Sequence, residues 1–397
     1  MFFLNFIQNI YLFMKKINIA YITKEDSSDA SQWSGTSLNI LKCLKKTNFN
    51  IIRIGPIGSF FEKVLKFVEL IYKLFNIKYD PERSILLSKI FAKKIYKLIS
   101  KKKIDLIFIH DCPLVSFLQT SVPIVIWTDL TFDLYQKTYF SNYSKFHNTS
   151  LKNGNYLERL SLNKAELIIY STKYAANNAK IKYQIKNDKI KIIPFGTDSS
   201  PISKKIFNIS NKKRIDRQNH QIRFLSIGVD WNRKNMEKSI HVVKELNDLK
   251  LNSKITIVGA VPPVNFKVPN FVNIVPFLDK KKLYDLNNLK KLYLNSDYFI
   301  LLSNAEAFGL VIQEAKSYGL PIITNNIDGI KYITNKNYTI LNKRNETPKK
   351  IATKILSINK KKYSELSKKS YLSSYNNSWV LASKKIGQIL NFIIKKK

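Results

Sequence analysis

Short apolar segments alternate with helical patterns along most of this chain, and this alternation constrains the fold more than any other feature. Segments of strand length occur at residues 17–22, 51–54, 104–109, 124–127, 167–170, 190–193, 223–227, 254–258, 272–276, 297–302 and 321–324. Apolar residues at helical spacing lie between several of them, as at 36–46 and 235–249. Strands that alternate with helices form parallel sheets covered by helices. The sequence therefore predicts an α/β protein.

The length of the chain predicts two domains. Its 397 residues are enough for two ordinary domains. Residues 199–220 are rich in Lys, Asn and Ser and show no periodicity, so we interpret them as a linker between two Rossmann-like halves. Two such halves facing each other create a cleft at the carboxyl ends of their strands, where ligands bind in this class of protein.

The start of the chain is apolar but is a poor targeting signal. Residues 1–13 have no basic segment before them, no small-residue cleavage site after them and too few residues to span a bilayer. The segment from Met14 resembles a natural start, which leaves residues 1–13 as an artefact of start-codon choice or a small surface anchor. The two cysteines, Cys43 and Cys112, fit a reducing compartment, so we expect a cytoplasmic protein.

The charge is strongly positive, with 67 Lys and Arg against 28 Asp and Glu and a net charge of +39. Such a chain can bind nucleic acid, an anionic membrane or phosphorylated substrates. Lys, Asn and Ile are abundant throughout, which is typical of an AT-rich genome, and we favour that origin. Residues 61–103 are predicted to be helical and basic, with apolar positions such as Val64 and Phe67 at helical spacing. We favour an ordinary core-facing helix with a solvated Lys face; peripheral contact with the inner face of an anionic membrane is the alternative.

Glu306 and Glu314 lie on either side of a predicted helix start. Glu306 follows the apolar strand 298–302, Gly309 opens the helix that carries Glu314, and residues 319–321 (Gly-Leu-Pro) close it. Unpaired amides at a helix N-terminus favour an anion such as phosphate. The carboxylates are better placed to accept hydrogen bonds from hydroxyls of whatever carries the phosphate.

From Met14 onward the chain resembles the family 4 glycosyltransferases of group 1, which have the GT-B fold. The Glu-x7-Glu spacing matches that family's acidic motif in a strand–loop–helix setting. The other motifs follow in the expected order, at residues 33–36, 123–125, 194–198 and 228–234. The resemblance implies an acceptor-side domain at 14–200, a nucleotide-sugar-binding domain at 201–376 and a helix at 377–397 that crosses back to the first domain.

The resemblance also implies roles for individual residues. Glu306 would hold hydroxyls of the transferred sugar, Glu314 would bind the ribose, and the amides near Phe308, Gly309 and Leu310 would receive the diphosphate. Lys234 and Arg233 would stabilise the charge that develops on the leaving group. In the first domain, Gly35 would let the backbone approach the donor closely, and Asp129 would belong to the active site.

Four positions depart from the family's usual pattern. Val229 replaces an Arg, and Asn235 and Ser34 stand where many relatives have Gly. Arg233 can supply the cation that Val229 does not. Asp129 replaces a His that contacts the sugar, so its chemical role stays open. His110 ends a strand, and a structural role is the simpler interpretation for it. By the resemblance Glu158 and Ser171 lie near the cleft, and helix or turn capping by their side chains is an equal alternative.

The sequence predicts no metal site, because it has no clustered His, Cys and carboxylate set and no Asp-x-Asp at a strand end. This fits the metal-independent habit of the GT-B fold, and the resemblance implies a retaining hexosyltransferase without a cofactor. It would take a nucleotide-diphosphate sugar as donor and a saccharide or lipid-linked acceptor, in glycan, cell-surface polysaccharide or glycolipid synthesis, and would bind no nucleic acid. A nucleotide-sugar epimerase of the same fold and a non-enzymatic nucleic-acid-binding protein are the alternatives. The sugar, base, acceptor and oligomeric state stay open.

Overall fold

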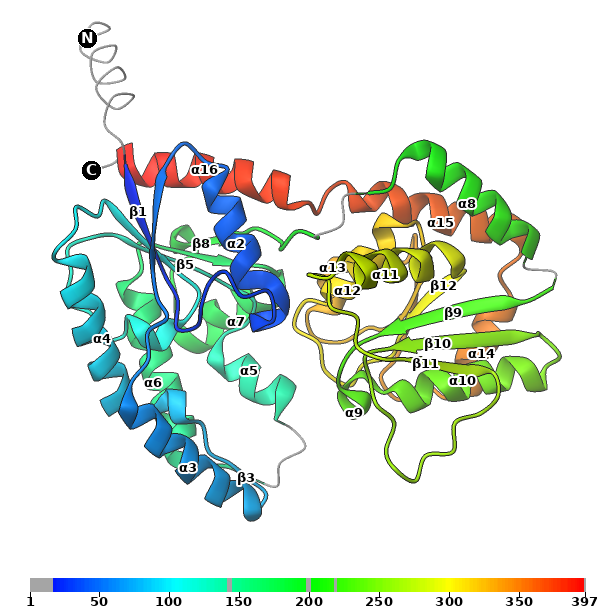
Figure 1. Cartoon of the computed structure of the whole chain (residues 1–397), viewed down its shortest axis with the longest axis horizontal. Helices are drawn as coiled ribbons and strands as arrows, with labels where there is room; N and C mark the ends of the chain where they lie inside the picture. The colour runs from blue at the N-terminus through cyan, green and yellow to red at the C-terminus, as the bar shows by residue number, and fades with distance from the viewer. Residues whose placement is uncertain (1–16, 141–144, 198–200, 218–219, 396–397) are drawn as a thin grey trace, which may run out of the picture. The chain divides into compact units, whose positions relative to one another are not determined.

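A computed structural model describes residues 17–140, 145–197, 201–217 and 220–395. The chain divides into two compact units (Figure 1). The first contains the residues up to Pro194 together with the segment from Trp379, and the second spans Phe195–Ser378. The predicted extension at residues 1–13 and the motif residue Asp198 lie outside the described residues.

The first unit is built on a six-stranded parallel sheet in the order β2-β1-β4-β5-β7-β8. Its strands are β1 (Asn18–Ile22), β2 (Asn50–Ile54), β4 (Leu106–Ile109), β5 (Ile124–Thr128), β7 (Leu167–Tyr170) and β8 (Ile190–Ile192), and β3 (Ile77–Lys78) pairs separately with β6 (Lys145–Phe146). Its helices are α2 (Thr36–Lys45), α3 (Phe60–Leu74), α4 (Ile85–Ile99), α5 (Phe132–Tyr139), α6 (Asn148–Lys164), α7 (Lys173–Tyr183) and α16 (Trp379–Lys395).

The second unit holds another six-stranded parallel sheet, in the order β11-β10-β9-β12-β13-β14. Its strands are β9 (Ile222–Ile227), β10 (Ser253–Val258), β11 (Val272–Val275), β12 (Tyr298–Leu301), β13 (Ile322–Asn325) and β14 (Thr339–Asn342). Its helices are α8 (Lys204–Arg217), α9 (Trp231–Lys234), α10 (Met236–Asp248), α11 (Leu283–Asn295), α12 (Leu310–Ser317), α13 (Ile330–Ile333), α14 (Pro348–Leu356) and α15 (Lys360–Ser374). The predicted pair of Rossmann-like halves is confirmed.

The strand order of the second sheet reverses between β9 and β12. From β9 the chain moves outward through β10 to β11, then returns to the other side of β9 as β12. The connections that follow β9 and β12 therefore leave the carboxyl ends of these two strands in opposite directions. Such a switch point is where open parallel sheets bind ligands.

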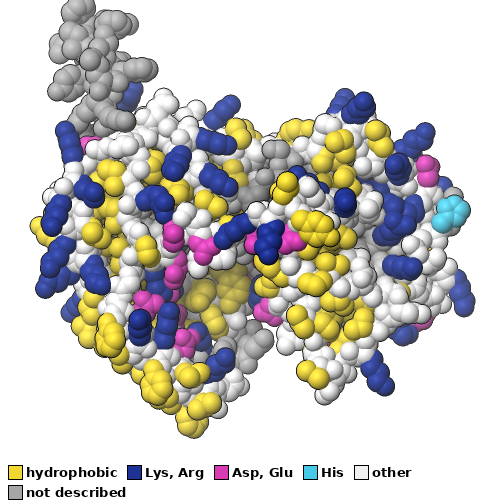
Figure 2. All heavy atoms as spheres, in the orientation of Figure 1, with side chains coloured by type: hydrophobic (Ala, Val, Ile, Leu, Met, Phe, Trp, Pro, Cys, Tyr) yellow, Lys and Arg dark blue, Asp and Glu magenta, His cyan; other side chains and the backbone are white. Residues whose placement is uncertain are grey.

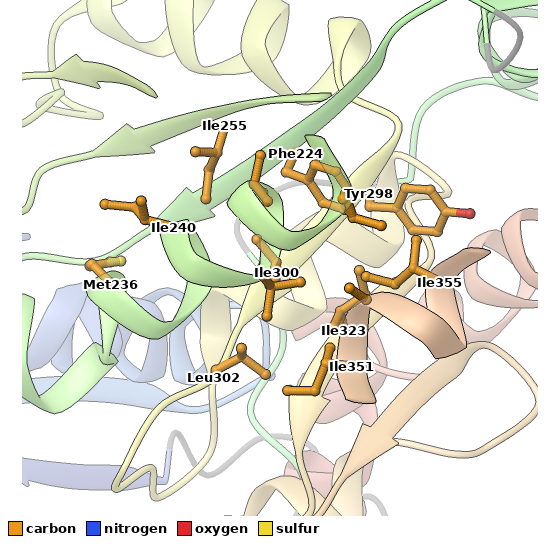
Figure 3. Packing of buried hydrophobic residues seen from close by; sticks show 14 of the residues in the cluster. Phe224, Met236, Ile240, Ile255, Tyr298, Ile300, Leu302, Ile323, Ile351 and Ile355 are labelled. Carbon is orange, nitrogen blue, oxygen red and sulfur yellow. The ribbon is translucent and has the colours of Figure 1, made fainter. Parts of the chain in front are cut away.

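The core of the second unit lies where the sheet packs against α10 and α14 (Figure 3). Phe224, Ile300 and Ile323 point from the strands toward Ile240 and Ile351 of the helices, and all five are buried. Burial of each such side chain contributes about 1.5–3 kcal/mol. The inward positions predicted for the helix at 235–249 are confirmed, because every third or fourth residue of α10 from Met236 is buried.

The predicted linker at 199–220 was wrong for most of its length, because α8 occupies it. Phe207 stacks on Tyr371 with ring centroids 4.2 Å apart. The fully buried Arg214 donates hydrogen bonds to the carbonyl oxygens of Tyr318, at 2.8 Å, and Tyr293, at 3.1 Å. Phe207 and Arg214 are the buried residues of this helix, so its sequence has no apolar periodicity that would indicate a packed helix.

The predicted helical segment at 61–103 is two helices with different environments. β3 and a 3-10 turn at Pro81–Arg83 separate α3 from α4. The apolar residues of α4, such as Phe91 and Ile95, are buried as expected. The expectation of a core-facing helix was wrong for α3, whose apolar residues Val64 and Phe67 are exposed.

Candidate functional site

The loops that follow β9 and β12 are joined at the switch point of the second sheet. The backbone N–H of Asn304 donates to the carbonyl oxygen of Arg233 at 2.8 Å. The side-chain amide of Asn304 donates to the carbonyl oxygen of Asn232 at 3.0 Å. Asn235 donates in turn to Asn304 Oδ1 at 3.2 Å. These three hydrogen bonds fix α9, with its basic residues, against the loop that carries Glu306.

Lys234 and Glu306 form an ion pair between Nζ and Oε2, and both residues are buried. Arg233 approaches the same carboxylate oxygen, with its NH1 atom 3.7 Å away. The stem of Lys234 crosses Gly228, where a Cβ atom would lie 2.7 Å from Lys234 Cγ. Gly228 is therefore required for the close approach of the lysine, and a larger residue would push the ammonium away from Glu306.

The backbone of Glu306 is held by the loop that precedes α13. Its carbonyl oxygen accepts a hydrogen bond from the Gly329 N–H at 3.2 Å, and its own N–H donates to Asp328 Oδ2 at 3.4 Å. A Cβ atom on Gly329 would lie 1.6 Å from the Ala307 carbonyl oxygen. Burial raises the pKa of Asp328. The position of Glu306 is thus set by backbone contacts that tolerate little change.

Gly309 begins α12 in a left-handed conformation, with φ at +74°. Glycine adopts this conformation at low cost, and here it turns the chain sharply from the Glu306 loop into the helix. Phe308 is buried, with its ring centroid 5.5 Å from that of Phe195. The first N–H groups of a helix have no intrahelical acceptor and carry partial positive charge. The start of α12 therefore offers donors for an anion beside Lys234 and Glu306.

Glu314 lies one turn inside α12 and is buried, so it is not a solvated helix residue. The Tyr293 hydroxyl donates to its Oε2 at 3.0 Å, and Lys280 forms an ion pair with its Oε1. The Tyr293 ring stacks on Tyr318 at 4.7 Å, which holds the hydroxyl in place. Sequence reasoning missed Lys280 and Tyr293, because neither belongs to a spaced motif and Lys280 is one of three consecutive lysines.

Two of the departures from the family pattern occupy left-handed positions. Asn235 has φ at +52° between α9 and α10, and Asn tolerates this conformation better than most residues. Ser34 has φ at +55°, between Trp33 at +46° and Gly35 at +79°. Glycine would fit both positions with less strain. Val229, where many relatives have Arg, is exposed.

Gly35 and Asp129 belong to the first unit. Gly35 is buried and precedes α2, and a Cβ atom there would contact the Ala30 carbonyl oxygen at 3.4 Å. Asp129 is half-buried at the carboxyl end of β5, as predicted. His110 follows β4, where its ring lies 4.8 Å from that of Trp33 and its Nε2 lies 3.3 Å from Ser37 Oγ.

Two further polar residues named from the sequence are buried in the first unit. Burial raises the pKa of Glu158. Its Oε1 and the Ser171 hydroxyl have no hydrogen-bond partner within the part of the chain that the structure describes. Over the same residues, no group of three or more His, Cys, Asp and Glu side chains gathers closely enough to hold a metal ion.

The structure therefore brings Arg233, Lys234, Glu306, Gly309 and Glu314 together within one unit. The buried Lys234, the half-buried Arg233 and the helix N-terminus suit an anion. The buried carboxylates are acceptors that suit hydroxyl groups, and each is paired with a lysine. The arrangement can bind a molecule that carries both phosphates and hydroxyls.

Comparison with known proteins matches both halves of the chain. Residues 208–376 match the family described as "Glycosyl transferases group 1", and residues 39–200 match "Glycosyltransferase Family 4". The lipopolysaccharide glucosyltransferase WaaG of Escherichia coli is 26% identical over 50% of this chain and 52% of its own.

Solved structures share the fold over nearly the whole chain. A glycosyltransferase from Rickettsia africae has a TM-score of 0.61 at 19% identity and covers 96% of this chain and 100% of its own. Anabaena HepE, solved in complex with UDP-glucose, has a TM-score of 0.59 at 15% identity and covers 94% of this chain and 99% of its own.

Proposed function

Because this chain is a family 4, group 1 glycosyltransferase of the GT-B fold, we propose that it transfers a hexose from a nucleotide-diphosphate sugar to an acceptor hydroxyl. The donor would bind at the switch point of the second sheet. The observation that carries this proposal is the convergence of Lys234, Glu306 and the start of α12 where β9 and β12 separate. A nucleotide-diphosphate sugar carries the phosphates and hydroxyls that these groups suit.

We assign the roles of the donor-site residues by their chemistry. The amides of Gly309 and Leu310 bind the diphosphate, and Lys234 and Arg233 stabilise the charge that it gains as it leaves. Glu306 accepts hydrogen bonds from the sugar and Glu314 accepts them from the ribose. When the donor binds, hydroxyl groups of the ligand replace part of the contact that each carboxylate makes with its lysine. These cationic groups provide the stabilisation of the leaving group that a divalent ion could otherwise supply, so transfer proceeds without a metal.

We propose that transfer retains the anomeric configuration, as the resemblance implies. The acceptor hydroxyl attacks carbon 1 of the sugar from the face that the diphosphate leaves. The bond to the diphosphate oxygen breaks, the new glycosidic bond forms, and the acceptor's proton passes to the departing phosphate oxygen. Within the first unit, Asp129 and Gly35 are the residues that we propose for ligand binding.

For the acceptor we propose a saccharide or a lipid-linked saccharide of a cell-surface glycan. This is supported by the similarity to WaaG, which is described as a lipopolysaccharide glucosyltransferase. For the donor, the similarity to HepE, solved with UDP-glucose, makes uridine-linked hexoses the first to test.

A panel of nucleotide-sugars in a thermal-shift assay tests the proposal. Uridine-, guanosine- and adenosine-diphosphate sugars are compared with the free diphosphates and with inorganic phosphate. One class of nucleotide-sugar should raise the melting temperature of the wild type but not that of Glu314→Gln. An identical response to every compound would contradict a donor site.

The same donor then serves for a transfer assay with and without acceptor. Nuclear magnetic resonance of the product gives the anomeric configuration, and the reaction is repeated with a chelator. Product with inverted configuration would contradict the retaining mechanism. Turnover of the nucleotide-sugar to its epimer without acceptor would instead favour an epimerase of this fold.

A further inference from the structure

Helix α3 exposes its apolar residues instead of burying them. Phe60, Phe67 and Leu74 are 79%, 65% and 80% exposed. Val64, Leu70, Ile71 and the following Phe75 are also exposed. Most of these residues recur at intervals of three and four, so they lie on one face of the helix. Figure 2 shows apolar side chains gathered at the lower left, where Figure 1 places α3. We call these seven residues the α3 face.

The opposite face of α3 is fixed to the first unit by charged and aromatic contacts. Glu62 is buried and lies 3.1 Å from Lys24 Nζ and 3.2 Å from Lys66 Nζ. Glu69 accepts a hydrogen bond from Lys78 at 2.6 Å. Tyr72 stacks on Tyr79 at 5.4 Å. Rotating the apolar residues inward would break the contacts to Lys24, Lys78 and Tyr79, which lie outside the helix. These contacts therefore set the outward orientation of the α3 face.

Basic residues border the α3 face. Lys63, Lys66 and Lys73 follow one side of the helix, and all three are exposed. A surface pocket of about 300 Å³ opens on this side, lined by Lys66, Glu69, Leu70, Lys73, Ile77 and Lys78. Residues 60–103 contain twelve basic and four acidic residues. The surface therefore combines an apolar face with a row of lysines along one side of it.

We propose that the α3 face binds the surface of an anionic lipid bilayer. The apolar side chains enter the boundary between headgroups and acyl chains, and the lysines of the pocket bind headgroup phosphates. No helix of the described residues is long and apolar enough to cross a membrane. Because only one face of α3 is apolar, the helix lies along the membrane surface in this arrangement. A second copy of this chain fits the face less well, because its own lysines would meet Lys66 and Lys73 and repel them.

This proposal stands independently of the transfer reaction. A membrane surface recognises the α3 face whatever sugar the donor site binds. If the proposed function also holds, the first unit lies at the surface that would carry a lipid-linked acceptor.

Vesicle flotation with the full-length protein tests the proposal. The protein is mixed with phosphatidylcholine vesicles that either lack or contain phosphatidylglycerol. We expect the wild type to float with the anionic vesicles and to remain largely free with the neutral ones. Phe67→Ser combined with Ile71→Ser should weaken binding to anionic vesicles about tenfold or more, since it removes two large side chains from the buried apolar area. Melting temperature should stay close to that of the wild type, because both residues are exposed.

Ile181→Ser combined with Phe392→Ser is the matched control. Ile181 and Phe392 are 82% and 70% exposed and belong to other helices, α7 and α16, so this variant should bind as the wild type does. Lys66→Gln combined with Lys73→Gln should weaken binding at low salt and reduce its dependence on salt.

Any one of four outcomes would overturn the proposal. The first is that the wild type does not float with anionic vesicles. The second is that it floats equally well with neutral vesicles. The third is that the Phe67 and Ile71 variant floats as well as the control variant. The fourth is that sedimentation without lipid shows a wild-type dimer that the same variant dissociates, which would assign the α3 face to a second copy of the chain.

Discussion

Lys234 and Glu306 form a buried ion pair although they lie 72 positions apart in the chain. The pair joins the loops after β9 and β12, the two strands between which the second sheet changes direction. A buried ion pair contributes little net stability, whereas loss of one partner leaves an uncompensated charge. The pairing is therefore better explained as preorganisation of charge at a binding site than as a device for stability.

Replacing Glu306 by Gln should separate its role in transfer from its role in folding. The amide keeps the shape of the side chain but is a weaker acceptor and does not balance Lys234. We expect kcat/KM for transfer to fall about 100-fold or more, with the sheet structure retained by circular dichroism. The exposed Glu237, in the first turn of α10, supplies the control Glu237→Gln, which should be as active as the wild type. Equal activity of Glu306→Gln would remove Glu306 from the site.

Gly228→Ala tests whether the position of Lys234 matters. The added Cβ would lie 2.7 Å from Lys234 Cγ, a flexible side chain that can move aside. We expect kcat/KM to fall about tenfold, equivalent to about 1.4 kcal/mol, and the melting temperature to change little. Gly58→Ala is the control, because nothing lies within 4 Å of a Cβ atom there. If both variants transfer sugar at the wild-type rate, the stem of Lys234 can shift without consequence.

Ser34→Gly should stabilise the first unit. Ser34 has φ at +55°, a conformation that costs a residue with a side chain roughly 1–2 kcal/mol. Part of this gain is offset by the greater freedom of glycine in the unfolded chain, which leaves about 0.5 kcal/mol or more. Unfolding can be followed by tryptophan fluorescence, since Trp33, Trp127 and Trp379 of the four tryptophans belong to the first unit. Ser34→Ala keeps the strain and should give no gain; an equal gain from Ala would contradict the explanation.

Lys316 should make stability depend on pH. It is buried in α12, where its Nζ donates to Gln313 Oε1 at 2.8 Å, and burial lowers its pKa from the ordinary value of 10.5 to about 7. Between these values the unfolded chain binds more protons than the folded one, so this residue makes the free energy of unfolding rise with pH. Below about pH 7 both states are protonated, and the folded protein bears the full cost of the buried charge.

Lys316→Met should therefore raise the free energy of unfolding at and below pH 7 by about 2 kcal/mol or more, since each unit of pKa shift corresponds to about 1.4 kcal/mol. The gain should shrink as the pH rises toward 10.5. The exposed Lys350 of α14 gives the control Lys350→Met. Denaturant titrations at several pH values measure this gain in the free energy of unfolding. A gain that did not change with pH would mean that Lys316 is not buried as a charged group.

The sequence predicted those features that local spacing encodes. The alternating strands, the inward face of α10 from Met236, and the setting of Glu306 and Glu314 around Gly309 all depend on residues close together in the chain. Lys280 and Tyr293 could not be assigned to Glu314, because contacts across 34 and 21 positions leave no local pattern.

The two wrong expectations have related causes. α8 is held by Arg214 through backbone carbonyl oxygens of distant residues. The outward orientation of α3 is set by partners of Glu62 and Glu69, of which Lys24 is remote in the sequence. In both helices, polar contacts with residues remote in the sequence set the orientation. Hydrophobic periodicity was absent from α8, and in α3 it indicated the wrong face as buried.

Calorimetric titration with nucleoside diphosphate and monophosphate tests most directly whether Lys234 and the start of α12 form the diphosphate site. The nucleoside is the one selected by the nucleotide-sugar panel. The wild type should bind the diphosphate about tenfold or more tightly than the monophosphate, because a charge-assisted contact is worth about 1.5–3 kcal/mol. In Lys234→Met this ratio should fall toward one, while Lys244→Met, at an exposed lysine of α10, should keep it. An unchanged ratio in Lys234→Met would contradict the assignment of the donor site.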